Sequence, residues 1–307
     1  MVDERFNYEP MFFSHPDPSM RWESSFLNLT LDYPLWISSM TGGTAHARTI
    51  NENLARLCGK YKLGMGLGSC RPLLTSSERT AEFAVRKFMG NQPLFANIGI
   101  AQVEELVDQG KTGKLGELVR SLEADGLFIH LNPLQEWFQP EGDRFKVSPL
   151  VTLRTLFDRG VEYPVLVKEV GQGMGPRSIK ALLELPIKGI ELGAFGGTNF
   201  TLLESLRGVD EQTKKAFITV GHTALEMIEI INALPTRDKE FIISGGIKNV
   251  LDAYGLKTRL QANSVIGMAH AFLAPAMESF EALETYFLNL RESLLTAKGL
   301  LDLKEDG

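Results

Sequence analysis

The chain has 307 residues, of which 44% are hydrophobic, and a formal net charge of −6. This length and composition predict one large barrel or two domains, and the scattered basic residues argue against a nucleic-acid-binding surface. No apolar run approaches the roughly 18 residues of a membrane span, and the start MVDERFNYEP lacks the features of a signal peptide. The two cysteines have neither the spacing of a metal site nor that of a disulfide framework. We therefore expect a cytoplasmic protein.

Eight short apolar runs recur along the chain, each bounded by glycine, proline or polar residues. They are mostly continuous rather than alternating, which indicates strands buried on both faces, as in a parallel sheet. The runs are PLWISSM (34–40), LGMGLGS (63–69), LFANIG (94–99), GLFIHLN (126–132), VLVKEVG (165–171), GIELGAFGG (189–197), FIISGG (241–246) and SVIGMA (264–269).

Segments with helical spacing of apolar residues lie between most of these runs. One of them has Ser148 as its expected N-cap and Gly160 as its expected C-cap. Because strand and helix alternate through eight rounds, the pattern predicts a single (β/α)₈ TIM barrel. The helical segments are 49–61, 101–110, 115–126, 148–160, 178–186, 223–234 and 252–260.

Three segments depart from the simple repeat. Residues 1–33 form an N-terminal extension before the predicted barrel over 34–275, and an amphipathic helix is predicted within 276–307. The connection over 198–222 is much longer than a usual strand-to-helix loop. Long loops of this kind lie on the carboxyl face of a barrel, where we expect a lid.

Polar residues gather where the apolar runs end, most densely in HLNPLQE (130–136). His130, Asn132, Gln135 and Glu136 follow a buried strand, and Pro133 ends that strand because it has no N–H for the ladder. Polar groups are costly to bury unpaired, so four at one strand end indicate a ligand site. All eight strand ends meet at one face of a barrel, which is where barrel enzymes have their active sites.

Glycines follow several of the predicted strands. Gly245, Gly246 and Gly267 match the two loops that bind phosphate in many barrels, although such glycines can also serve tight turns alone. Lys168 lies inside an apolar strand, where it could stabilise an anionic ring or an enolate, or form a salt bridge with Glu169. Adjacent strand residues face opposite ways, which disfavours the salt bridge.

Neutral hydrogen-bonding residues ring the same predicted mouth, among them Thr41, Ser69 and Asn97. A flat cofactor with polar edges and a phosphate tail fits this set, and FMN is such a cofactor, whereas a nicotinamide would need a Rossmann fingerprint that the chain lacks. Glu136 is the candidate for binding Mg²⁺. Arg71 is a candidate for bidentate phosphate binding, with a surface ion pair as the alternative.

The motifs occur in the order MTGG, GSxR, ANIG, HLNPLQE, KEVGxG, GGTxF, SGG and GMA over residues 34–275. In this respect the chain resembles the type 2 isopentenyl diphosphate isomerases, which are FMN-dependent barrel enzymes. The chain lacks the His-x-x-Arg motif that the 2-hydroxy-acid oxidase relatives carry at a strand end. The resemblance therefore implies interconversion of isopentenyl and dimethylallyl diphosphate, with no net redox change.

The resemblance also implies roles for individual residues. The flavin would be reduced by NADPH and act as the acid–base agent, assisted by Gln135, Glu136 and Lys168, with Glu136 binding Mg²⁺. Flavin contacts are expected from Met40, Thr41, Ser69, Asn97, Lys168, Thr198, Gly245, Gly246 and Ala269. Contacts with the isoprenoid diphosphate are expected from Ser69, Cys70, Arg71, His130, Asn132 and Gln135.

The chain differs from the family pattern chiefly near its N-terminus. An Arg-Lys-x-x-His signature that binds diphosphate in the family is absent, and Arg5 and His15 are expected to substitute for it. This difference leaves two alternatives, which are a flavin oxidoreductase of the same barrel lineage acting on another substrate and a non-catalytic phosphate-binding barrel. Members of the family form homotetramers or octamers, so a homo-oligomer is expected.

Overall fold

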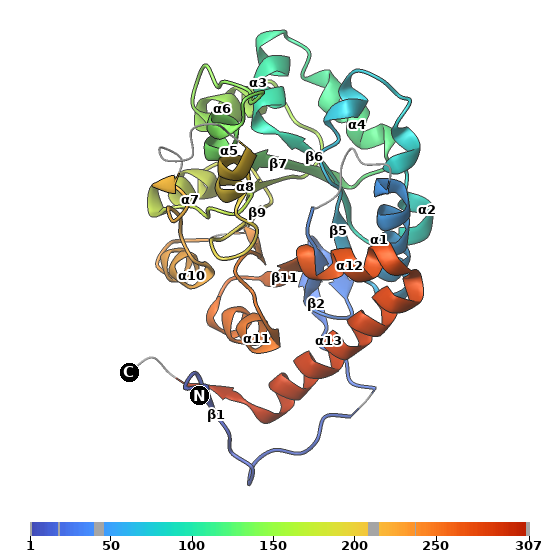
Figure 1. Ribbon diagram of the computed structural model, residues 1–307, viewed down its shortest axis with the longest axis vertical. Coiled ribbons are helices and arrows are strands. Elements are labelled where there is room, and N and C mark those ends of the chain that lie inside the picture. The colour runs from blue at the N-terminus through green and yellow to red at the C-terminus, as the bar shows by residue number, and fades with distance from the viewer. Residues whose placement is uncertain (1, 18, 40–45, 208–214, 237, 305–307) are drawn as a thin grey trace.

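A closed barrel of eight parallel strands forms the centre of the computed structural model (Figure 1). The structure describes residues 2–17, 19–39, 46–207, 215–236 and 238–304. Around the barrel the strands follow the order β10-β11-β4-β5-β6-β7-β8-β9. Their bounds are β4 Leu35–Ile37, β5 Gly64–Gly66, β6 Leu94–Gly99, β7 Gly126–Leu131, β8 Val165–Glu169, β9 Gly189–Glu191, β10 Glu240–Ile243 and β11 Ser264–Met268. All eight predicted strands and the predicted barrel are confirmed.

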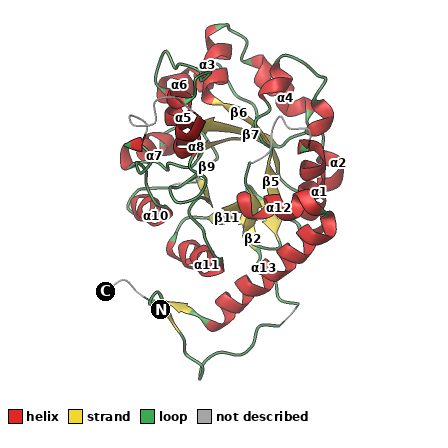
Figure 2. Cartoon of the chain, in the orientation of Figure 1, coloured by secondary structure: helices red, strands yellow, loops and turns green. Residues whose placement is uncertain are grey.

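Helices surround the barrel, as Figure 2 shows by colour. Ser148 is the N-cap of α6, as predicted, but its side chain accepts no capping hydrogen bond, whereas Thr223 and Asn249 form capping boxes at α10 and α11. The bounds are α1 Ala47–Tyr61, α2 Arg86–Met89, α3 Ile100–Asp108, α4 Gly113–Ser121, α5 Pro133–Phe138, α6 Pro149–Asp158, α7 Pro176–Leu183, α8 Phe200–Arg207, α10 Ala224–Asn232, α11 Val250–Arg259, α12 His270–Glu278 and α13 Phe280–Leu300, with short 3₁₀ turns η1 Arg71–Leu74 and η2 Thr80–Glu82.

The core has two parts because successive strand residues face opposite sides. Residues such as Ile190 and Ile243 point outward and pack in the larger cluster between the barrel and its helices. A smaller cluster fills the barrel interior around the fully buried Trp36, whose ring lies over Gly64, where a side chain would collide with it. The inward-facing members of this cluster are Trp36, Phe95, Phe128, Leu166, Ile242 and Val265.

The N-terminal extension closes the end of this interior that lies opposite the carboxyl ends of the strands. Its hairpin, made of β2 Ser24–Phe26 and β3 Leu29–Leu31, places Phe26 and Leu31 in the same cluster as the inward-facing strand residues. The Phe26 and Trp36 ring centroids are 5.5 Å apart in an edge arrangement. The extension therefore contributes to the barrel core, a role that the sequence pattern did not predict.

The two ends of the chain meet on the outside of the helical ring (Figure 1). Strand β1, Phe6–Asn7, pairs antiparallel with β12, Asp302–Leu303, just after the predicted terminal helix, which is α13. Phe6 packs in a small cluster with Tyr254 of α11 and Ala297 of α13. This pairing ties the N-terminal segment to the last helix, on the outer side of α11.

The long connection after β9 carries helix α8, which packs against α5 beside the barrel mouth. The Phe138 and Phe217 rings make a tilted contact with centroids 5.4 Å apart, and they join the two connections. Whether this connection acts as a lid stays a prediction. Among the helices that the structure describes, none has both the length and the apolar character that crossing a membrane requires.

Candidate active site

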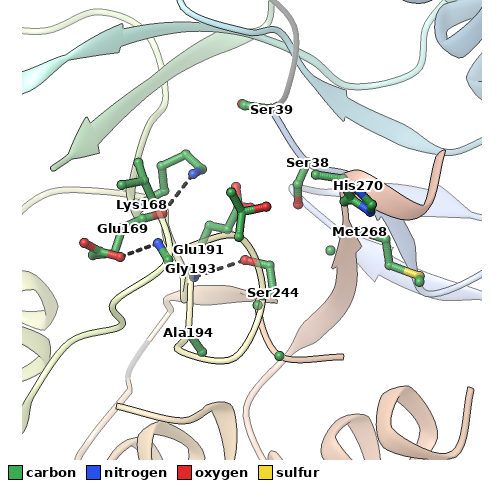
Figure 3. A pocket seen from close by; sticks show the side chains of 18 of the residues that line it. Ser38, Ser39, Lys168, Glu169, Glu191, Gly193, Ala194, Ser244, Met268 and His270 are labelled. Carbon is green, nitrogen blue, oxygen red and sulfur yellow. Dashed lines mark hydrogen bonds between the residues drawn. The ribbon is translucent and has the colours of Figure 1, made fainter. Parts of the chain in front are cut away.

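A cavity of about 840 Å³ opens at the carboxyl ends of the barrel strands. It is lined by residues from many of the strand ends, as the sequence predicted for a barrel enzyme (Figure 3). Nine predicted site residues contribute to the lining, and the tertiary fold thus brings them together. They are Ser69, Asn97, His130, Gln135, Lys168, Thr198, Gly245, Gly246 and Ala269.

The floor of the cavity follows from the alternation of the strands. Two residues beyond each inward-facing apolar residue, the next inward-facing position is polar or glycine on most strands. At this change of residue type, the packed interior ends and the hydrogen-bonding floor of the cavity begins. Its polar members are Ser38, Asn97, His130, Lys168, Glu191 and Ser244.

Lys168 is only 7% exposed, and its Nζ donates a hydrogen bond to the backbone carbonyl of Glu169 at 2.8 Å. The alternative prediction, a salt bridge between these two side chains, is wrong, because no such ion pair occurs between these described residues. The Glu169 carboxylate instead accepts the backbone N–H groups of Gly171 and Gln172, each at 2.6 Å. Burial raises the pKa of Glu169 despite these bonds. Lys168 is therefore a buried cation directed at the cavity.

His130 and Asn97 form a pair on neighbouring strands, with 2.9 Å between His130 Nδ1 and Asn97 Oδ1. An amide oxygen only accepts, so this assignment has the proton on Nδ1. Burial, with a smaller contribution from the charge of Lys168, lowers the pKa of His130 to about 3. His130 is therefore neutral near pH 7, and any role in binding diphosphate rests on hydrogen bonding rather than on charge.

Two glycine turns lie against each other at the ends of β9 and β10. Gly245 has a φ of +86°, and a Cβ there would lie 2.1 Å from the carbonyl oxygen of Ala194. A Cβ on Gly197 would lie 3.2 Å from the backbone nitrogen of Gly246. Only glycine fits at position 245, and both turns place backbone at the cavity wall.

Helix α12 begins directly after β11, and its N-cap residue Ala269 offers no side-chain cap. Ala269, His270 and Ala271 line the cavity, so the first N–H groups of this helix are near it. Together with the Gly245–Gly246 turn, this helix start fits a phosphate group. The buried Lys168, the amide of Asn97 and the glycine turns thus fit a flat, polar-edged cofactor with a phosphate tail, as FMN is.

Glu136 lies beside the cavity but is not one of the residues that line it. Its Oε1 accepts a hydrogen bond from Asn132 Nδ2 at 2.9 Å, and its Oε2 accepts the N–H of Asp143 at 2.6 Å. In the described ranges, no group of three or more His, Cys, Asp or Glu side chains is placed to hold a metal. Glu136 therefore fits Mg²⁺ only as a single carboxylate, with water and substrate phosphates completing the shell.

Arg71 forms an ion pair with Asp143, at 3.0 Å between Nη1 and Oδ2, and more than half of its side chain is exposed. The same Asp143 oxygen accepts a hydrogen bond from Gln102 at 2.7 Å. The predicted alternative of a surface ion pair is therefore present in this structure. Because exposed pairs contribute at most about 1 kcal/mol, Arg71 remains available to a diphosphate.

The remaining predicted residues lie outside the cavity lining or outside the described ranges. Cys70 is fully buried, with its thiol directed at the Gly68 carbonyl, and burial raises its pKa to about 12. Arg5 pairs with Asp3 and Asp252, each at 2.7 Å, on the outer side of α11. The exposed His15 and the buried Asn132 do not line the cavity, and Met40 and Thr41 lie outside the described residues.

The predicted site residues did not include three polar members of the cavity floor, Ser38, Glu191 and Ser244. The pattern that could have revealed them is a period of two. Trp36 and Ile242 face the interior, so the residues two further along must face it too. Glu191 lies in the apolar run GIELG, as Lys168 lies in VLVKEVG. A charged residue inside an apolar run indicates a site more strongly than the period of two does.

Comparison with proteins of known identity places the chain in a family. It is 35% identical over 303 residues to the isopentenyl-diphosphate delta-isomerase of Rickettsia peacockii (strain Rustic), a match that covers 94% of this chain and 86% of the relative. The corresponding protein of Hydrogenovibrio crunogenus is 34% identical and is covered over 81% of its length. The chain belongs to the isopentenyl-diphosphate delta-isomerase family. The predicted resemblance to the type 2 isomerases is thereby confirmed, although no general family model matches the sequence.

Solved structures agree with this family at the level of the fold. A mandelate oxidase mutant carrying an FMN adduct matches with a TM-score of 0.59 at 14% identity, covering 99% of this chain and 89% of the oxidase. A flavocytochrome b2 double mutant with bound sulfite matches with a TM-score of 0.64 at 15% identity, covering 98% of this chain and 76% of the cytochrome. At such low identity, these matches show only that this isomerase-family protein shares their barrel fold.

Proposed function

We propose that this protein interconverts isopentenyl and dimethylallyl diphosphate, using reduced FMN as the acid–base agent and Mg²⁺ on the substrate diphosphate. The observation that carries this proposal is the identity of about 35%, over nearly the whole chain, with proteins that bear the isomerase name. The polar cavity at the barrel mouth supports it, since its donors suit a flavin with a phosphate tail. We also propose NADPH as the reductant of the flavin.

In this proposal, two groups of cavity residues bind two parts of the cofactor, its ring and its phosphate. Lys168, Asn97 and Ser69 would face the polar edge of the ring, where a buried cation favours an anionic form. The turn at Gly245 and Gly246 and the start of α12 would hold the phosphate. Met40, Thr41, Thr198 and Ala269 remain proposed flavin contacts.

Moving a double bond requires a proton at one carbon of the substrate and the loss of a proton from another. Bound reduced flavin would supply this acid–base chemistry next to the alkene. Gln135 lines the cavity and would orient the substrate, while Asn132 holds both Gln135, at 3.1 Å, and Glu136 through its side-chain amide. Apolar residues of the lining, such as Phe200 and Met268, would surround the hydrocarbon part and exclude water.

The diphosphate would lie toward Arg71, His130 and the Mg²⁺ on Glu136. Arg5 and His15 remain our proposal for further diphosphate contacts, although Arg5 is held by Asp3 and Asp252 in this structure. Such a contact requires movement of the N-terminal segment or a second copy of the chain. The latter suits a homo-oligomer, which we propose as a tetramer or octamer located in the cytoplasm.

The test is turnover of isopentenyl diphosphate by the purified yellow protein with Mg²⁺ and NADPH. Glu136→Gln should reduce Mg²⁺-dependent turnover at least about tenfold and retain bound flavin, because one ligand carboxylate is lost but the cavity is kept. Glu141→Gln is the matched control, since Glu141 is exposed on the same loop and contacts Gln139. A colourless protein that cannot be reconstituted with FMN would contradict the proposal.

A second candidate is an FMN-dependent oxidoreductase of the same barrel lineage that acts on another substrate. The position of Arg5 favours it, because this residue lies on the outer side of α11 and not at the cavity that a diphosphate would occupy. Consumption of NADPH in proportion to product would support the oxidoreductase. Catalytic NADPH, with many turnovers per molecule oxidised, would support the isomerase.

A further inference from the structure

Glu191 is the most deeply buried charged residue of the cavity floor, with 1% of its surface exposed. It lies on β9 in register with Lys168 on β8, and both side chains face the barrel interior. Its Oε2 atom is buried and has no hydrogen-bond partner among the described residues. Figure 3 shows the carboxyl group directed into the cavity between Lys168 and Ser244.

A buried carboxylate oxygen without a donor is strongly unfavourable, so this one needs a donor in the cavity, from water or from a ligand. Lys168 is not that partner in this structure, because its Nζ donates to the Glu169 carbonyl and no ion pair joins it to Glu191 within the described ranges. The missing partner must therefore donate hydrogen bonds from within the cavity.

Two serines, just beyond the ends of β4 and β10, belong to the same cavity floor. Ser38 Oγ is buried and has no partner among the described residues, and Ser244 Oγ accepts the N–H of Gly193 at 3.1 Å, which leaves its O–H free to donate. Both serines border Gly267, where a Cβ would lie 2.6 Å from Ser38 Oγ and 3.0 Å from Ser244 Cβ. Glycine at this position keeps space open beside the two serines. The cavity floor thus offers one acceptor and two hydroxyls, which suits a chain of hydroxyl groups.

The position of Glu191, Ser38 and Ser244 along the cavity indicates which chain of hydroxyl groups they bind. On one side lie the glycine turn of β10 and the start of α12, which fit a phosphate, and on the other lie Lys168 and Asn97, which fit a ring edge. FMN has its three parts in this order, with the ribityl chain between phosphate and ring. We propose that Glu191 binds the ribityl hydroxyls of FMN, with Ser38 and Ser244 completing the polyol site. The proposal rests on the FMN function proposed above.

The first test compares three flavins in binding to the apoprotein. FMN has ring, polyol and phosphate, riboflavin lacks the phosphate, and lumiflavin has the ring alone. Glu191→Ala should weaken FMN and riboflavin by about 10- to 100-fold, the effect of losing hydrogen bonds to a charged group, and leave lumiflavin within about twofold. The exposed Glu162→Ala serves as control. An equal loss for lumiflavin, or no loss for FMN, would overturn the polyol assignment.

The second test uses Glu191→Gln, which keeps the shape and removes the charge. Without flavin this variant should melt at a higher temperature than the wild-type apoprotein, because an unpaired buried charge is gone. With saturating FMN it should gain less in melting temperature than the wild type, since it binds FMN more weakly. A lower apoprotein melting temperature combined with an unchanged FMN shift would overturn the inference. Failure of the wild-type chain to bind FMN would instead overturn the proposed function, and the inference with it.

Discussion

The two inward-facing layers of the barrel lie on the same strands and differ by only two residues in sequence. The lower layer contains Trp36, Phe95 and Phe128, is closed by Phe26 of the N-terminal hairpin, and packs as a dry core. The upper layer has Ser38, Asn97 and His130 at the next inward positions, and it forms the cavity floor. One strand therefore supplies stability and chemistry from successive positions on one face.

The largest effect is expected in the lower layer. Phe128→Ala should reduce the free energy of unfolding by about 3–5 kcal/mol, because it leaves a cavity beside Trp36 and Phe95. Urea unfolding of the apoprotein measures this loss. Phe12→Ala, at a side chain that is 83% exposed, should change the same quantity little. If Phe128→Ala kept full stability and lost only flavin binding, the two layers would not be distinct.

In the upper layer the expected effect is on turnover. Lys168→Met should reduce isomerase turnover by about 100- to 1,000-fold, the usual effect of removing one preorganised electrostatic donor. Its melting temperature should not fall below that of the wild type, since burial of a charged group is costly to the fold. Initial rates with reduced FMN and Mg²⁺ measure the loss, and Lys180→Met on the exposed face of α7 is the matched control. Turnover within threefold of wild type would remove Lys168 from the reaction.

The smallest effect concerns pH and His130. Its pKa is about 3 in the fold against 6.5 ordinarily, so the unfolded chain takes up a proton below pH 6.5 and the folded chain does not. The stability that the neutral imidazole provides is full above pH 6.5 and is lost as pH falls toward 3, by about 2 kcal/mol between pH 7 and pH 5. His130→Gln should lack this dependence, and the difference between the two unfolding curves isolates it. Parallel curves would show that the pKa of His130 is not lowered in the fold.

Much of the barrel could be predicted because each strand carries its own pattern. Seven of the eight apolar runs contain a whole barrel strand, β10 begins one residue before the run FIISGG, and the run LFANIG coincides with β6 over residues 94–99. The hairpin of residues 24–31 was not predicted, since Phe26 and Leu31 have no periodic pattern and find their partners only inside the closed barrel. The N-cap of α6 also shows that a local pattern predicts a position but not a side-chain contact. Ser148 is at the predicted position, and its side chain makes no capping hydrogen bond.

For the site, the residue pattern was enough to predict that polar groups end the strands, because strand length and burial are local properties. It also identified Lys168, Asn97 and the glycines of the β10 turn as members of one face. The tertiary structure alone decided which side chains are paired. Arg71 and Asp143 are 72 residues apart and form an ion pair, whereas Lys168 and Glu169 are adjacent and form none. The folded barrel brings the segments after β5 and β7 together and pairs Arg71 with Asp143, whereas Lys168 and Glu169, as neighbours on one strand, face opposite ways.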